Sequence, residues 1–86
     1  MTNAKEVVEV IVKAIVNKPE FVTVTEINTE NVTIIEIRTD KSEIGKIIGK
    51  QGIVANAIRS ILNPIYGKIK RRYVLEIMDD KKSNDK

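Results

Sequence analysis

The sequence predicts one small α+β domain with the element order α-β-β-α-α-β. Three observations lead to this fold class. Apolar residues recur at helical spacing near the start of the chain, two runs of β-branched residues follow, and glycines then separate two helical patterns before a last β-branched run. The 86 residues are too few to share a core between two domains. We therefore expect one domain over residues 1–79 and a charged, disordered tail over residues 80–86.

The first half of the chain is typical of a helix followed by a hairpin. Four apolar residues recur on one helical face: Val8, Ile11, Val12 and Ile15. They predict a helix over about residues 4–17, which Pro19 closes. The segments FVTVTEIN (21–28) and VTIIEIRT (32–39) are rich in β-branched residues, and NTEN between them supplies turn formers. Two antiparallel strands are expected here.

The second half predicts two helices separated by glycines and then a third strand. Asp40 followed by Glu43 marks the start of a short helix. Gly49 stands where a left-handed glycine ends a helix, and Gly52 where a small residue caps the next one. That next helix carries an apolar stripe and ends at Gly67. Because Pro64 disfavours helical structure, the sequence does not decide whether the last turn is helical. The stripe consists of Val54, Ile58, Ile61, Leu62 and Ile65. The segment RRYVLEIM (71–78) is the expected strand.

Composition excludes several function classes. The chain has no cysteine and no histidine, which removes thiolate chemistry, the usual zinc sites and the commonest general base. The near-apolar stretch over residues 7–16 contains Glu9 and Lys13 and is far shorter than the roughly 20 residues that span a bilayer. We therefore expect a cytoplasmic protein without membrane contact, catalytic residues, metal or cofactor.

The segment GKIIGKQG, residues 45–52, is the most informative part of the sequence. A tight turn between two helices explains Gly49 and Gly52, but it does not explain Lys46 and Lys50. A backbone without side chains lets another chain come close, and the first amides of the following helix carry partial positive charge. Phosphate groups suit such a place.

The segment IIGKQGIVANAI, residues 47–58, resembles the core motif of the KH domain, in which a Gly-x-x-Gly loop between two helices clamps about four nucleotides. A helix and a strand ahead of the β-α-α-β core resemble the type II, bacterial form. The whole chain is similar to small bacterial single-KH proteins of the KhpA type. This resemblance implies a three-stranded sheet covered on one face by helices, with single-stranded RNA lying between the glycine loop and the sheet edge.

The resemblance also implies site residues. It assigns the sugar-phosphate backbone to four loop residues: Gly49, Lys50, Gln51 and Gly52. Ile48 would contact the bases. We add Lys46 and Arg59 as cations along the rim, although both are equally consistent with solvated helix surface. Ile53 departs from the family pattern, in which a polar residue commonly follows the second glycine, and this departure concerns affinity more than fold.

Two alternatives belong to other function classes. A phosphate loop of NTPases fails on the spacing of its glycines, and Glu36 and Glu43 are single carboxylates expected to face water rather than to hold Mg²⁺. A protein interaction module without RNA binding is the stronger alternative, because Val7, Val10 and Ala14 add apolar surface to the first helix.

The resemblance implies a homodimer, a larger KH-containing partner protein, or both. The expected function is RNA binding by a post-transcriptional regulator or RNA chaperone.

The aromatic residues and the densest basic run lie outside the motif. Phe21, Tyr66 and Tyr73 are interpreted as core and helix-end packing, since they form no obvious platform for base stacking. The run KIKRR (68–72) either extends an RNA path or forms a solvated turn. We favour the solvated turn.

Overall fold

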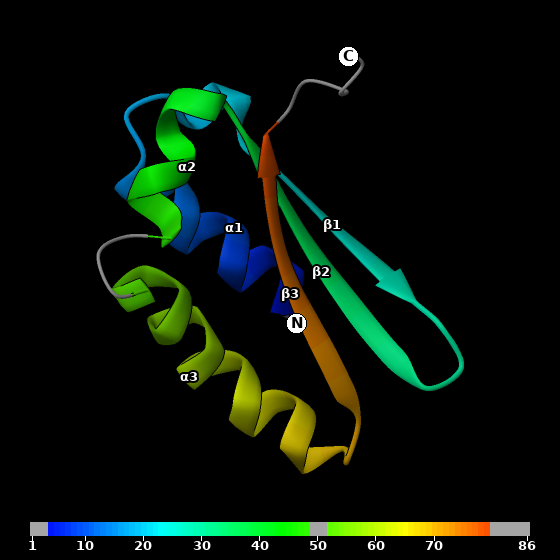
Figure 1. Cartoon of the computed structure of the whole chain (residues 1–86). Helices are drawn as coiled ribbons and strands as arrows, with labels where there is room; N and C mark the ends of the chain where they lie inside the picture. Colours follow the sequence, from blue (N-terminus) through cyan, green and yellow to red (C-terminus); the bar gives the residue numbers. More distant parts are fainter. Residues whose placement is uncertain (1–3, 49–51, 80–86) are drawn as a thin grey trace.

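The computed structural model describes residues 4–48 and 52–79 and confirms the predicted order of elements (Figure 1). The elements are α1 (Ala4–Ile15), η1 (Pro19–Phe21), β1 (Thr23–Asn28), β2 (Val32–Thr39), α2 (Lys41–Ile48), α3 (Ile53–Lys68) and β3 (Arg72–Asp79). The short 3₁₀ turn η1 was not predicted, and Pro19 occupies its first position, where the missing N–H is harmless. The predictions for Gly49, Lys50, Gln51 and the tail over 80–86 lie outside the described residues.

The three strands form one mixed sheet in the order β1-β2-β3. β2 pairs antiparallel with β1, with Ile27 opposite Ile34, and parallel with β3, with Ile34 opposite Val74. Parallel neighbours need a long crossover, and α2 and α3 provide it. All three α-helices lie on one face of the sheet, as expected (Figure 1).

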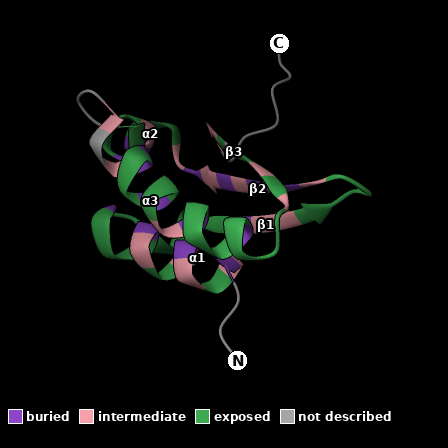
Figure 2. Cartoon of the chain, turned by 90° about the horizontal axis from the view of Figure 1, so that it is seen from below, coloured by how far each residue is buried: buried purple, intermediate pink, exposed green. Residues whose placement is uncertain are grey.

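The core lies between this helical layer and the sheet. β2 alternates strictly, so that Thr33, Ile35, Ile37 and Thr39 are buried under the helices while their neighbours are only partly buried. Each helix contributes fully buried side chains: Val8 and Val12 of α1, Ile47 of α2, and Ile58 and Leu62 of α3. Figure 2 shows these buried positions on the helices and on β2. Burial of each such side chain contributes about 1.5–3 kcal/mol.

Two helix predictions need correction. α1 buries Ala4, Val8 and Val12, and Val16 just past its end is also buried, whereas Ile15 is 38% exposed, so the core face is rotated from the predicted stripe. α3 runs through Pro64 and one residue past Gly67, to Lys68. Pro64 is exposed, so the carbonyl that loses its helical hydrogen bond is close to solvent.

Candidate nucleic-acid interface

Gly52 opens α3 with a left-handed backbone, at φ 66° and ψ 28°. A Cβ at this position would meet only the Nδ2 atom of Asn56, at 3.8 Å, so space alone does not demand a glycine. The backbone conformation does, because side chains of L-residues crowd the following carbonyl in this region. A glycine also leaves the first amides of α3 without a side-chain cap at the positive end of the helix.

The last turn of α2 leads toward this point with one buried and one exposed isoleucine. Ile47 is fully buried, whereas Ile48 is 46% exposed. Lys46 is exposed, and its Nζ lies 3.9 Å from Oε1 of Glu43. Ile47 therefore anchors α2, while Ile48 and Lys46 stay accessible just before the glycine loop.

Arg59 lies on the exposed face of α3, seven residues after Gly52, which is about 10 Å along the helix axis. No described residue forms an ion pair with it. Four of the seven predicted site residues are thus described. The structure brings Lys46, Ile48 and Gly52 to the two helix ends that flank the loop, and it places Arg59 farther along.

Glu43 was predicted to face water, and this prediction is wrong. The residue is 2% exposed, and its Oε2 accepts a hydrogen bond of 3.0 Å from the backbone N–H of Asn17. Asn17 lies just past the end of α1, where backbone groups lack helical partners. Oε1 is also buried and accepts no hydrogen bond within residues 4–48 and 52–79. Glu43 therefore joins the end of α1 to α2 and fixes the helix that carries Lys46 and Ile48.

Asp40 caps the start of α2, as the sequence predicts. Its Oδ2 accepts hydrogen bonds from the hydroxyl of Ser42 and from the Ser42 backbone N–H, the latter at 3.1 Å. Lys18 lies nearby, with Nζ at 3.7 Å from Oδ2. The two bonds from Ser42 are the main cause that lowers the pKa of Asp40 below its ordinary value of 3.8, with Lys18 adding to the effect. The charged carboxylate thereby stabilises the first turn of α2.

Arg71 corrects the interpretation of the basic run as a solvated turn. Its Nε donates to Oγ1 of Thr33 at 2.7 Å, and Nη2 donates to the carbonyl of Val32 at 2.9 Å. Nη1 and Nη2 also donate to the carbonyls of Glu30 and Thr29. The guanidinium thus ties the β1–β2 turn to the start of β3. Lys68, Lys70 and Arg72 are exposed, as predicted.

The tyrosines pack at the same end of the molecule. Tyr66 is buried, and its ring stacks on Tyr73 with a centroid distance of 5.4 Å, which confirms the packing interpretation for both. Burial first, and then the Glu26 carboxylate, raise the pKa of Tyr66, while Arg71 lowers it. Phe21 differs from the prediction, because it is 44% exposed at the end of η1.

Comparison with known proteins decides the family. The family model described as KhpA/KhpB, KH domain, matches residues 5–77. The chain belongs to this family. A protein of Aquifex aeolicus named RNA-binding protein KhpA is 47% identical over 79 residues, which cover 92% of this chain and 100% of that relative. A protein of the same name from Borreliella burgdorferi is 44% identical over 77 residues, covering 90% of this chain and 94% of the relative.

Solved structures give the same fold for this KH domain. The structure of Aquifex aeolicus Era bound to GDP and aluminium fluoride matches with a TM-score of 0.61 at 20% identity. A second Era structure, in complex with MgGDPNP and a fragment of 16S ribosomal RNA, matches with a TM-score of 0.54 at 25% identity. Each match covers 88% of this chain but only 29% of the Era chain. The likeness therefore concerns the KH fold and not the rest of Era.

The relatives named for RNA binding, which share this KH domain, do not belong to an enzymatic family. Among the described residues, no cluster of three or more acidic side chains is arranged to hold a metal ion. Over the same residues, none of the helices has the length and apolar character required to cross a bilayer.

Proposed function

We propose that this KH protein binds single-stranded RNA through the loop over residues 49–52. The observation that supports it best is the left-handed Gly52 at the start of α3, which leaves the positive end of the helix open to a ligand backbone. Relatives of nearly the same length carry the name RNA-binding protein. In this proposal Gly49 and Gly52 admit the sugar-phosphate chain, and Lys50 and Gln51 contact its phosphates.

The neighbouring residues have smaller roles in the proposal. Ile48, which is 46% exposed, contacts a base. Lys46 and Arg59 add positive charge, and Arg59 adds more, because Lys46 is partly neutralised by Glu43 at 3.9 Å. Contacts to phosphate carry no sequence information, so we expect weak sequence preference.

We further propose that the protein acts in the cytoplasm as a post-transcriptional regulator or RNA chaperone, as a homodimer or with a larger KH protein. α1 supports such pairing, because Val10 is 68% exposed and Ala14 is also exposed beside the half-buried Val7. Pairing two KH domains would raise RNA affinity through effective concentration. A pairing module that binds no RNA is the competing function.

The test is a double variant, Lys50→Asp with Gln51→Asp, which changes the net charge of the loop by three. The matched control is Lys41→Asp with Thr23→Asp, two exposed positions outside the loop and outside the apolar side of α1, which changes the net charge equally. For the wild type, log affinity should fall with log salt at a slope of roughly −2 to −3.5, as three to five phosphate contacts to a single strand require. The loop variant should lose about tenfold or more in affinity and have a shallower slope.

Fluorescence anisotropy with labelled oligouridine measures both quantities, and circular dichroism checks that each variant folds. A folded loop variant that binds like the control would rule out the loop as the contact. A wild type that binds no RNA but self-associates in sedimentation would favour the pairing module.

A further inference from the structure

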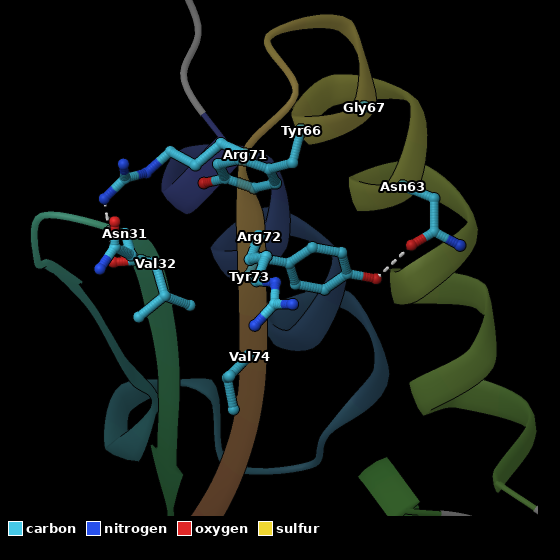
Figure 3. Close-up of a pocket in the computed structure, with 9 residues that line it drawn as sticks. All are labelled: Asn31, Val32, Asn63, Tyr66, Gly67, Arg71, Arg72, Tyr73 and Val74. Atoms are coloured by element: carbon cyan, nitrogen blue, oxygen red, sulfur yellow. Dashed lines mark hydrogen bonds between the residues drawn. The ribbon is translucent and has the colours of Figure 1, made fainter.

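A hollow of about 570 Å³ opens at the end of α3 far from Gly52 (Figure 3). Its volume lies within the range of small-ligand sites. Six polar or aromatic residues of its lining come from α3, from residues 71–73 at the start of β3 and from the β1–β2 turn: Asn31, Asn63, Tyr66, Arg71, Arg72 and Tyr73. Its α3 lining residues Asn63 and Gly67 lie 11 and 15 residues after Gly52, so the hollow is about 16–23 Å along the helix axis from the glycine loop and forms no part of it.

The hollow combines a fixed aromatic ring with exposed amide groups. Tyr73 stacks on the buried Tyr66, and its hydroxyl donates a hydrogen bond to Oδ1 of Asn63 at 2.5 Å. The ring is thereby held between β3 and α3, as Figure 3 shows. Asn63 and Asn31 are exposed and offer both donors and acceptors. Aromatic rings and amides of this kind receive unpaired bases of single-stranded nucleic acids.

Two arginines give the hollow a positive charge. The guanidinium of Arg71 is bonded to a hydroxyl and to backbone carbonyls, which are neutral acceptors. The Glu26 carboxylate, which raises the pKa of Tyr66, offsets only part of the charge of the two arginines. Arg72 is exposed, and neither arginine forms an ion pair within residues 4–48 and 52–79. Arg71 is occupied in holding the turn, whereas Arg72 is available to a ligand. A phosphate group is the ligand that this charge favours.

We propose that the hollow binds one further nucleotide of the single strand that the glycine loop holds. The base would lie against Tyr73 and the amide of Asn63, and Arg72 would bind the adjoining phosphate. A KH loop holds about four nucleotides, so this second contact needs a longer strand. The inference rests on the proposed RNA binding and extends it to the opposite end of α3.

The test compares the labelled oligouridines rU4 and rU12 on the wild type and on Arg72→Ala. The matched control is Lys41→Ala on α2, which also removes one exposed positive charge that has no ion pair among the described residues. We expect Arg72→Ala to weaken rU12 binding about three- to tenfold and to reduce its salt slope by about 0.7, because one phosphate contact is lost. Its affinity for rU4 should match that of the wild type, and the control should change neither affinity by more than about twofold.

Tyrosine fluorescence gives an independent readout. The chain has two tyrosines and no tryptophan, so the signal comes from Tyr66 and Tyr73, both of which line the hollow. After correction for RNA absorption, rU12 should quench it, whereas rU4 and free UMP should not. Quenching by UMP alone would instead assign the hollow to a free nucleotide and overturn the proposal.

Two other results would also overturn the inference. The first is equal weakening of rU4 and rU12 in Arg72→Ala, and the second is rU12 affinity in that variant equal to that of Lys41→Ala.

The loop variant Lys50→Asp with Gln51→Asp separates this inference from the proposed function. If that variant loses rU4 and rU12 while Arg72→Ala loses neither, only the hollow is excluded. If the wild type binds neither oligonucleotide, RNA binding itself is refuted, and this inference with it.

Discussion

The two ends of α3 are built in opposite ways. At its start, Gly52 has a left-handed backbone and gives the helix no side-chain cap. At its end, Tyr66 stacks on Tyr73, and Arg71 binds the β1–β2 turn. Glycine lowers stability by roughly 0.5–1 kcal/mol in a regular element, whereas hydrogen bonds from a charged group stabilise by about 1.5–3 kcal/mol. The hydrogen bonds at the end of α3 therefore offset the stability that is lost at its start, where a glycine replaces a capping side chain.

The largest stability effect should come from Arg71, at the end held by side chains. Arg71→Ala removes the donors to Thr33 and to the carbonyls of the turn, and we expect the free energy of unfolding to fall by about 2–4 kcal/mol. Arg71→Lys should recover only a small part, because one ammonium group cannot reproduce the fork of the guanidinium. Urea denaturation followed by circular dichroism measures both. A lysine variant as stable as the wild type would show that charge, rather than geometry, holds the turn.

A smaller effect is expected at Gly52. Gly52→Ala should lower the free energy of unfolding by about 1–2 kcal/mol because of the left-handed backbone, and Gly52→Asn should cost less, since asparagine tolerates this conformation. The matched control is Gly45→Ala within α2, where an added Cβ meets no described atom within 4 Å. That change should instead stabilise by about 0.5–1 kcal/mol. If both alanine variants shift the urea midpoint in the same direction, backbone conformation is not what selects Gly52.

The smallest effect on stability is expected at the start of α2, where, unlike at the start of α3, a side chain caps the helix. The pKa of Asp40 is lowered in the folded state, so its contribution to stability is complete above its ordinary pKa of 3.8 and is lost as the pH falls through the folded-state value. Asp40→Asn should therefore reduce the dependence of stability on pH below about pH 4, and it should change little near pH 6 because asparagine also caps helices. Thermal unfolding between about pH 2 and pH 6 measures this slope. Equal slopes in the two proteins would argue against a charged cap.

The sequence predicted the features that depend on residues close to one another along the chain. The order of elements follows from local periodicity, and the glycine at the start of α3 follows from the break between two helical patterns. Glu43 and Arg71 could not be placed this way, because their partners lie 26 and 38 residues away along the chain. Arg71 looks like the other cations of its run, so no local signal distinguishes it. The hollow was missed for the same reason, since three distant segments form it.

The parallel pairing of β2 with β3 has a consequence for biosynthesis. The β1–β2 hairpin is local and can close within microseconds, but β3 joins only after residues 40–71 have been threaded across the sheet. On the ribosome the glycine loop emerges before β3. A nascent chain that stops before Arg72 therefore has its loop but lacks the strand that pairs in parallel with β2. The three-stranded sheet is therefore complete only when the last described strand has been translated.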